Sequence, residues 1–476
     1  MSEHRDVLVI GAGLSGIGAA YRLQTECPER SYAILEARET SGGTWDLFRY
    51  PGVRSDSDMF TLGYPFRPWR EPKSIAAGRT ILEYLRDTAA EYGIDKRIHY
   101  GRRVVGASWS TADACWTVHT DAGEEWTCSF LYVCTGYYRY ESGYEPDFPG
   151  RERFTGDIVH PQRWPTGLDY AGKRVVVIGS GATAVTLVPA MAEQAAHVTM
   201  LQRSPSYLIS LPAREGDGRR VRPQAIRTRN VVLTWALFQA SRRWPQRVAK
   251  SLRQQVAKQL PADVPVDPHF VPRYHPWDQR LCVVPDGDLF AAMRAGRASV
   301  VTATIDTFTE HGIRLTDGEQ LDADVIVTAT GLTMVAFGEI ALTVDGRAID
   351  PHELHVYKGM MFDGLPNLAW CVGYTNASWT LRADLTSRYV CRLLNYLARH
   401  RIDIATPRLP ASAHDTGEPL LALTSGYVRR AAAALPRQSD RRSWRMLNNY
   451  LLDLPRMRLS RINDGDMMFA RTPTGE

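Results

Sequence analysis

A glycine-rich motif near the N-terminus has the residue types and spacing of a phosphate-binding turn. It reads Gly11-Ala-Gly13-Leu-Ser-Gly16 and follows a short apolar run. Glycines at this spacing allow a tight turn and close approach of the backbone to a pyrophosphate, and the following helix presents N–H donors to it. Glu36, twenty residues after Gly16, is placed to accept hydrogen bonds from both ribose hydroxyls and would repel a 2′-phosphate. The motif therefore predicts a site for FAD or NAD, and not for NADP.

A second motif of this kind reads Gly179-Ser-Gly181-Ala-Thr183-Ala. Here Arg203 stands where the first motif has its acid, and an arginine offers a partner for a 2′-phosphate. A charge-assisted hydrogen bond contributes about 1.5–3 kcal/mol, roughly ten- to hundredfold in affinity. The second site should therefore prefer NADPH, with Thr183 as a weaker candidate for the same phosphate. The alternative interpretation is that Arg203 is a solvated arginine at the end of a strand and binds no phosphate.

Two sites of opposite 2′-phosphate preference in one chain indicate hydride transfer from NADPH to a bound flavin. Each motif needs a strand before it and a helix after it, and the apolar pattern supplies both. The first strand–helix–strand unit covers residues 7–10, 14–25 and 32–36, and the second covers residues 174–178, 182–195 and 197–201. Further strands are expected at residues 116–119, 130–134 and 324–328, and helices near 225–241, 246–260 and 383–399.

These units predict an α/β fold with two Rossmann-like dinucleotide-binding domains, one for FAD and one for NADPH, and a helical insertion. A stretch with Pro and Gly at residues 143–150 indicates a linker. We expect the FAD domain at residues 1–148 and 332–476, the linker and first part of the NADPH domain at 149–204, the helical insertion at 205–280, and the second part of the NADPH domain at 281–331.

Composition argues against several other classes of protein. A net charge of +5 over 476 residues is too small to imply nucleic acid. The seven cysteines are scattered and form no C-x-x-C pair, which argues against a disulfide framework and a zinc site. No apolar stretch approaches the ~20 residues that span a bilayer. We therefore expect a soluble, cytoplasmic protein without a metal.

Two longer patterns carry a family resemblance. The first, F-x-G-x-x-x-H-x-x-x-W-P, is met by Phe154, Gly156, His160, Trp164 and Pro165. The second, [A/G]-G-x-W-x(4)-[F/Y]-P-[G/M]-x(3)-D, is met in full over residues 42–56. Through these patterns nearly the whole chain resembles the Baeyer–Villiger monooxygenases, which are class B flavoprotein monooxygenases. Residues 274–282 and 373–379 extend the resemblance to one branch of that family.

The resemblance implies roles for particular residues. Arg280 corresponds to the active-site arginine of the family and Asp56 to its partner acid. The arginine would stabilise an anionic flavin peroxide as it adds to a ketone to give an ester or lactone. His160 would assist domain motion and cofactor handling, and not act as a catalytic base. Contacts with the flavin cofactor are expected from Gly43, Trp45 and Asp46. The alternative interpretations are that Arg280 forms an ion pair on the surface and that Asp56 belongs to a turn without a catalytic role.

Other functions fit parts of this pattern. A heteroatom oxygenase acting on sulfur or nitrogen compounds is the nearest rival, since the same flavin peroxide serves both reactions; the partners are then dioxygen and either a small ketone or a heteroatom substrate. A flavin disulfide reductase needs a cysteine pair near the flavin, and we discard it because no cysteine lies between Cys27 and Cys115. A non-catalytic, NADPH-sensing flavoprotein is a remote alternative.

Residues 214–258 are strongly basic, and only Glu215 and Asp217 oppose their charge. The basic residues are Arg214, Arg219, Arg220, Arg222, Arg227, Arg229, Arg242, Arg243, Arg247, Lys250, Arg253 and Lys258. Aromatic and aliphatic residues are interleaved with them, so peripheral contact of a basic amphipathic helix with an anionic membrane is one interpretation. We favour the other, a solvated face of the helical insertion whose apolar side covers the active site.

Overall fold

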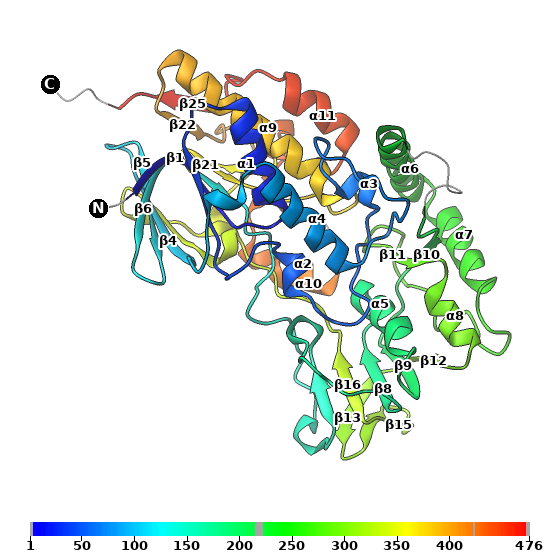
Figure 1. The fold of residues 1–476 in the computed structure, drawn as a ribbon. Coiled ribbons are helices and arrows are strands. Elements are labelled where there is room, and N and C mark those ends of the chain that lie inside the picture. The colour runs from blue at the N-terminus through cyan, green and yellow to red at the C-terminus, as the bar shows by residue number, and fades with distance from the viewer. Residues whose placement is uncertain (1–2, 215–221, 422–423, 473–476) are drawn as a thin grey trace.

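The computed structural model describes residues 3–214, 222–421 and 424–472. Within them, a nine-stranded sheet runs in the order β18-β17-β4-β5-β6-β1-β2-β3, with β21 paired to β6 (Figure 1). Strand β1 is parallel to β2 and β6, whereas β4, β5 and β6 form an antiparallel meander. The strands are β1 (Glu3–Ile10), β2 (Tyr32–Leu35), β3 (Ile98–His99), β4 (Val104–Ser110), β5 (Cys115–Thr120), β6 (Glu125–Val133), β17 (Ala341–Val344), β18 (Arg347–Ala348) and β21 (Leu368–Trp370).

A second, fully parallel sheet has the order β12-β9-β8-β16-β7. Its strands are β7 (Asp157–Val159), β8 (Arg174–Ile178), β9 (His197–Gln202), β12 (Ala298–Thr302) and β16 (Val325–Thr328). Beside it, β13 (Ile305–Thr309), β14 (Gly312–Leu315) and β15 (Gln320–Asp322) form an antiparallel sheet. Strands β8 and β16 are largely buried and mostly apolar, as parallel strands covered on both faces require, and β9 buries Val198, Met200 and Leu201. The predicted α/β fold with two dinucleotide-binding sheets is confirmed.

Each sheet carries a helix directly after its glycine-rich turn: α1 (Leu14–Glu26) on the first sheet and α5 (Ala182–Met191) on the second. Helix α1 packs against the long helix α9 (Trp379–His400). Arg22 of α1 pairs with Asp384 of α9 at 2.6 Å. The hydroxyl groups of Tyr132 on β6 and Ser387 on α9 share a hydrogen bond of 2.9 Å, which ties α9 to the sheet beneath it.

The predicted insertion contains the helices α6 (Pro223–Arg243) and α7 (Pro245–Ala257), close to the expected ranges. It also contains a strand, β10 (Leu208–Leu211), which pairs in parallel with β11 (Cys282–Pro285). The segment is therefore not purely helical. Residues 215–221, which include Glu215, Asp217, Arg219 and Arg220, lie outside the described part of the chain.

The other elements complete the two sheets and the C-terminal part. They are α2 (Thr44–Leu47), α3 (Met59–Leu62), α4 (Gly78–Glu91), α8 (Asp288–Arg294), α10 (Gly426–Ala431), α11 (Tyr450–Leu459), β19 (Val356–Tyr357), β20 (Met361–Phe362), β22 (Ile404–Pro407), β23 (Asp415–Pro419), β24 (Arg437–Ser439) and β25 (Met467–Ala470). One-turn 3-10 helices cover Asp95–Arg97, Arg151–Arg153, Pro161–Arg163, Phe337–Glu339, Pro351–Glu353, Ala432–Ala434 and Arg442–Trp444. None of the helices in the described ranges is long and apolar enough to cross a membrane.

Several element boundaries differ from the expected ones. Helix α5 ends at Met191, before the predicted 195, because the chain turns there to enter β9. Helix α9 begins at Trp379, before the predicted 383, since Trp379 packs beside the first glycine-rich turn. Strand β6 begins at Glu125, before the predicted 130, because it continues the meander from β5.

Candidate active site

A cavity of about 250 Å³ is bordered by the N-termini of both helices that follow the glycine-rich turns. Gly13, Leu14 and Ser15 line it from the start of α1, and Ala182 and Thr183 line it from the start of α5. The first N–H groups of a helix lack partners within the helix and lie at the positive end of its dipole. Both sides of this cavity therefore suit anionic groups.

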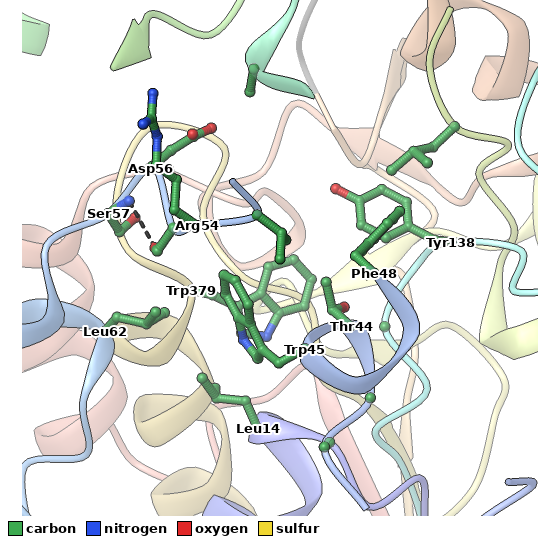
Figure 2. A pocket seen from close by; sticks show the side chains of 18 of the residues that line it. Leu14, Thr44, Trp45, Phe48, Arg54, Asp56, Ser57, Leu62, Tyr138 and Trp379 are labelled. Carbon is green, nitrogen blue, oxygen red and sulfur yellow. Dashed lines mark hydrogen bonds between the residues drawn. The ribbon is translucent and has the colours of Figure 1, made fainter. Parts of the chain in front are cut away.

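Aromatic and apolar side chains form much of the remaining wall. Figure 2 shows Trp45, Phe48, Leu62 and Trp379 around the cavity. The indole N–H of Trp379 donates to the hydroxyl of Ser15 at 2.8 Å, so α9 is joined to the start of α1. A wall of this kind suits a planar ring system and limits access of water.

The first glycine-rich turn is built for close backbone approach. A Cβ on Gly16 would lie 1.9 Å from the carbonyl oxygen of Gly11, so only glycine lets α1 pack this closely on β1. Gly43 has a φ of +55°, and a Cβ there would lie 3.0 Å from the Cα of Gly13. The two turns therefore face each other without side chains between them, and this groove fits a pyrophosphate.

Glu36 lies just past the end of β2, beside this groove. Its carboxylate accepts hydrogen bonds from the backbone N–H groups of Ala12 at 2.6 Å and Arg38 at 3.0 Å. Burial raises the pKa of Glu36, although these N–H donors offset part of the rise. The structure thus places Glu36 next to the first turn, where a ribose would lie beside a bound pyrophosphate.

Asp46 has a different environment from its neighbour Trp45. Its buried carboxylate pairs with Arg38 at 2.6 Å and with Arg86 at 3.0 Å, and it does not line the cavity in the described structure. Arg38 in turn donates to the carbonyl oxygen of Gly43 at 3.4 Å. Asp46 is therefore linked to the groove at Gly43 through Arg38, a residue that the sequence analysis did not single out.

The second glycine-rich turn leaves room for a ligand. A Cβ on Gly179 would lie 2.4 Å from the carbonyl oxygen of Ala329, whereas a Cβ on Gly181 would meet no atom within 4 Å. Thr183 lines the cavity and contacts the hydroxyl of Tyr50. Burial, together with the charge of Asp56, raises the pKa of Tyr50 to about 12, so Tyr50 stays protonated.

Arg203 is exposed directly after β9, a position that fits both a residue that binds a 2′-phosphate and a solvated arginine at a strand end. The guanidinium of Arg430, on α10, lies 3.3 Å from the ring centroid of Tyr144. Burial lowers the pKa of Arg430. The charge of the nearby Arg203 lowers this pKa further, whereas Tyr144 raises it. The two arginines are thus close enough to interact, and together they favour an anion. Arg430 lies far from Arg203 in sequence, and no sequence signal connects them.

Asp56 and Arg280 line the same cavity although a long stretch of chain separates them. Burial raises the pKa of Asp56, while the guanidinium groups of Arg280 and Arg54 counteract that rise. The Nε of Arg280 donates to the carbonyl oxygen of Thr375 at 3.1 Å, which holds the guanidinium at the cavity. The structure therefore brings together the arginine and the acid that the sequence predicted as a pair.

Three tyrosines surround Arg280 and were missed from the sequence. Burial lowers the pKa of Arg280, but Tyr137, Tyr427, Tyr138 and Asp56 outweigh it, so the net shift is upward and the group stays charged. The hydroxyl of Tyr138 donates to that of Tyr137 at 3.0 Å. Tyr137 and Tyr138 follow β6 closely, and ligand sites of parallel sheets form at the carboxyl ends of strands. Their position just after a strand was therefore a sequence signal by which these two tyrosines could have been predicted as site residues.

The loop that carries Asp56 also contacts the second sheet. Gly52 has a φ of +75°, and a Cβ there would lie 2.6 Å from the Cβ of Ala190 on α5. Arg54 forms an ion pair with Asp288 at the start of α8. Close approach and charge pairing therefore connect the two dinucleotide-binding halves beside the cavity.

His160 lies directly after β7, in the segment that joins β7 and β8 of the second sheet, and it is not among the described residues that line the cavity. In the described structure its Nε2 lies 3.3 Å from the carbonyl oxygen of Gly331, and its Nδ1 accepts a hydrogen bond from the N–H of Gln162 at 3.2 Å. These contacts fit the neutral tautomer with the proton on Nε2. Burial lowers the pKa of His160, although Glu145 opposes this, so the ring is neutral at neutral pH.

The other residues of the same pattern pack around the second sheet. Phe154 is buried in the core on one side of it, and Trp164 packs against the core on the other. A Cβ on Gly156 would lie 2.3 Å from the carbonyl oxygen of Asp324, so the glycine permits the approach of β7 to β16. The residues of this pattern thus stabilise the second sheet, and their role in domain motion stays a prediction.

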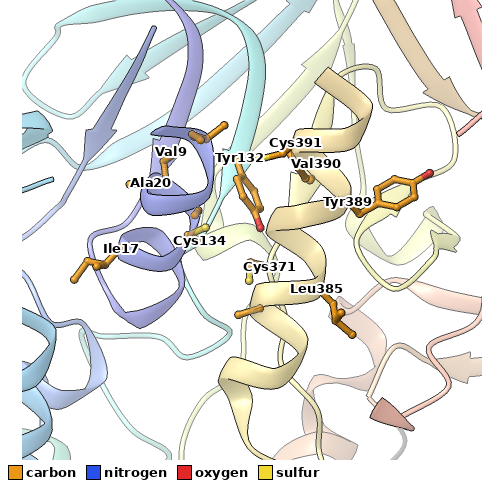
Figure 3. Packing of buried hydrophobic residues seen from close by; sticks show 14 of the residues in the cluster. Val9, Ile17, Ala20, Tyr132, Cys134, Cys371, Leu385, Tyr389, Val390 and Cys391 are labelled. Carbon is orange, nitrogen blue, oxygen red and sulfur yellow. The ribbon is translucent and has the colours of Figure 1, made fainter. Parts of the chain in front are cut away.

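Two cysteines lie next to each other where β6 and β21 end, and sequence spacing did not reveal them. The N–H of Cys371 donates to the carbonyl oxygen of Val133 at 2.8 Å, and Cys134 borders the cavity. Figure 3 shows both thiols between α1 and α9. Burial raises the pKa of Cys134 well above its ordinary value, which makes that thiol a poor nucleophile.

The fold and the cavity define a protein with two dinucleotide-type cradles that converge on one site. Residues 4–399 match the family described as Flavin-binding monooxygenase-like, and the chain belongs to this family. It is therefore a flavoprotein monooxygenase, and the disulfide reductase alternative is excluded on this ground.

Individual relatives cover the whole chain. It is 51% identical over 486 residues to the FAD-containing monooxygenase EthA of Mycobacterium tuberculosis, with 99% of each chain covered. It is 46% identical over 482 residues to the probable FAD-binding monooxygenase AlmA of Acinetobacter baylyi, with 98% of this chain and 97% of that one covered.

Solved structures share the fold. The protein resembles an oxidised steroid monooxygenase bound to NADP, with a TM-score of 0.80 and 24% identity over 98% of this chain and 100% of that one. It also resembles the open crystal structure of cyclohexanone monooxygenase, with a TM-score of 0.72 and 21% identity over 85% of this chain and 90% of that one. At these identities the likeness establishes the fold alone.

Proposed function

We propose that the protein is an FAD-dependent, NADPH-consuming Baeyer–Villiger monooxygenase that converts a ketone to an ester or lactone. One observation carries the proposal: both cofactor cradles open onto a single cavity that also holds Arg280 and Asp56. Two cofactors can meet only where their binding sites share a space, and a cation in that space can act on a reacting carbonyl.

FAD fits the first cradle. The groove between Gly13 and Gly43 would hold its pyrophosphate, Glu36 its ribose, and the aromatic wall with Trp45 and Trp379 its ring system. When bound and reduced, the flavin supplies the electrons that activate dioxygen. The chain's own contribution is to position the ring and to keep water from it.

NADPH fits the second cradle. Its pyrophosphate would lie at the N-terminus of α5, where Gly181 leaves open space, and Arg203 with Arg430 would bind the 2′-phosphate. The relatives named as FAD-containing and the fold neighbour bound to NADP support this pair of cofactors.

Arg280 supplies the electrostatic part of the reaction. Its guanidinium stays charged among the tyrosines and would stabilise the negative charge that develops on the oxygen of the substrate carbonyl. The nearby carboxylate of Asp56 favours this charged form and would help to orient it. No proton transfer by His160 is needed.

Oxygenation of a sulfide or amine is the second candidate. The apolar wall suits a thioether, and a lone pair on sulfur develops no oxyanion that Arg280 must stabilise. Replacement of Arg280 by methionine should therefore abolish ketone oxygenation far more than sulfide oxygenation. Arg314→Met, at an exposed arginine on β14, is the matched control.

The test uses purified protein with FAD, NADPH and isotopically labelled dioxygen, with a panel of ketones and sulfides of matched shape. One labelled oxygen in each product molecule, with one NADPH consumed, supports the proposal; products from ketones support the Baeyer–Villiger assignment. Consumption of NADPH with equivalent hydrogen peroxide and no product contradicts both candidates. A protein that binds both cofactors yet consumes no NADPH with any substrate would be a sensor.

A further inference from the structure

Helices α6 and α7 present an apolar and basic surface to solvent at one edge of the molecule (Figure 1). Large apolar side chains are exposed there: Val232 by 44%, Leu233 by 58% and Trp244 by 51%. Soluble monomers rarely expose clustered apolar side chains unless the patch contacts something. We call the exposed side of these two helices the α6–α7 surface, defined by Val232, Leu233, Arg243, Trp244, Arg247 and Lys250.

The orientation of α6 is set by contacts on its opposite side. Nη1 of Arg227 donates to the carbonyl oxygens of Phe60 at 2.8 Å, Thr61 at 3.1 Å and Gly63 at 2.8 Å. Val231 lies on this inner side and is buried. Since α6 is held in this way, Val232 and Leu233 face outward and no described part of the chain covers them.

The charge of the α6–α7 surface has one sign. The sequence has no Asp or Glu between Asp217 and Asp263, and Arg243, Arg247 and Lys250 are all exposed, whereas Arg242 pairs with Asp278 at 3.0 Å. A second copy of this chain docked symmetrically on the same surface would place these cations against each other. An anionic layer complements them instead.

We propose that the α6–α7 surface docks on an anionic lipid bilayer. Leu233 and Trp244 enter the headgroup region, and Arg243, Arg247 and Lys250 lie over the lipid phosphates. This arrangement covers the exposed apolar groups and pairs the cations at the same time. The inference does not depend on the oxygenation chemistry.

Docking would place the active site next to the bilayer. Arg227 holds α6 on α3, and Leu62 of α3 lines the active-site cavity. The sequence-based preference was a solvated face whose apolar side covers the active site. The inner side of α6 lies on α3, which borders the active-site cavity, but the outer side is apolar as well as basic.

The experiment is co-sedimentation of the full-length, FAD-loaded protein with vesicles of phosphatidylcholine alone or of equal parts phosphatidylcholine and phosphatidylglycerol. We expect binding to the anionic vesicles that falls with added salt. Arg243→Glu should weaken binding about fivefold or more, since each basic residue contributes about 1 kcal/mol near an anionic surface. Leu233→Asp should weaken it at least as much.

Val105→Asp is the matched control, because Val105 is 42% exposed on β4, away from α6 in Figure 1. Unchanged unfolding temperatures establish that all variants fold. Absent binding, equal binding to neutral vesicles, or equal losses in Leu233→Asp and Val105→Asp would each overturn the proposal. A dimer in light scattering that Leu233→Asp dissociates, without vesicle binding, would also overturn it and assign the surface to a second copy.

Discussion

Arg54 pairs with Asp288, the first residue of α8, and this ion pair joins the loop that carries Asp56 to the second sheet. The same loop places Gly52 against α5. Because Asp56 follows so closely, its position at the cavity depends on how the two halves of the molecule meet.

Replacement of Asp288 by asparagine removes the charge pairing with Arg54. A partly exposed ion pair contributes about 0.2–1 kcal/mol, so we expect the KM for NADPH to rise by between about 1.5- and 5-fold. Hydrogen peroxide released per NADPH consumed should rise as well, because the loop holds Asp56 less firmly. Asp121→Asn, at an exposed turn, is the control. If Asp288→Asn changes neither the KM for NADPH nor the hydrogen peroxide released per NADPH consumed, the Arg54–Asp288 ion pair has no such role.

Asp56→Asn should lower activity and raise stability. Burial raises the pKa of Asp56 above its unfolded value of 3.8, so its stabilising contribution exists below that value and is lost as pH rises through the folded pKa. At neutral pH the charged carboxylate costs stability, and asparagine should therefore raise the unfolding temperature. We expect ketone turnover to fall about tenfold or more, since about 1.4 kcal/mol is a factor of ten in rate. Thermal unfolding and steady-state kinetics test both; a stable variant with full turnover would exclude the assigned role.

Arg203→Ala should weaken the binding of NADPH and leave the binding of NADH unchanged. Loss of a charge-assisted hydrogen bond costs about 1.5–3 kcal/mol, so the KM for NADPH should rise roughly ten- to hundredfold. Arg430→Ala should act in the same direction if both arginines bind the 2′-phosphate. Arg79→Ala, at an exposed position on α4, is the control. An equal rise in KM for NADPH and for NADH would mean that Arg203 does not bind the 2′-phosphate.

His160 should make stability depend on pH. Burial lowers the pKa of His160 below its unfolded value of 6.5, so its contribution to stability is present above that pH and is lost as pH falls through the folded pKa. Protonation of Nδ1 would also remove the hydrogen bond from Gln162. We expect the drop in unfolding temperature between about pH 7 and pH 5 to be smaller in His160→Gln than in the wild type. His311→Gln, at an exposed histidine, should leave the drop in unfolding temperature as in the wild type. An equal drop in His160→Gln and His311→Gln would contradict a contribution of His160 to the pH dependence of stability.

The two cradles were predictable because each is local in sequence. Gly11, Gly13 and Gly16 lie between a strand and a helix that follow one another directly, so their spacing implies the turn. The position of Arg203 was predictable for the same reason, since it follows β9 directly, and its binding of a 2′-phosphate stays a prediction. The position of Arg430 near Arg203 was not predictable, because Arg430 belongs to a distant helix.

The sequence by itself therefore determined the α/β fold, the two cradles and the class of cofactor each suits, because neighbouring residues along the chain encode them. Only the tertiary structure decided the cavity wall, where Asp56, Tyr138, Arg280 and Trp379 meet from separate segments. It also decided which side of α6 is buried: the apolar pattern is compatible with more than one orientation, and the contacts of Arg227 select the one that leaves Leu233 exposed. Such positions depend on packing between distant segments, which no local pattern specifies.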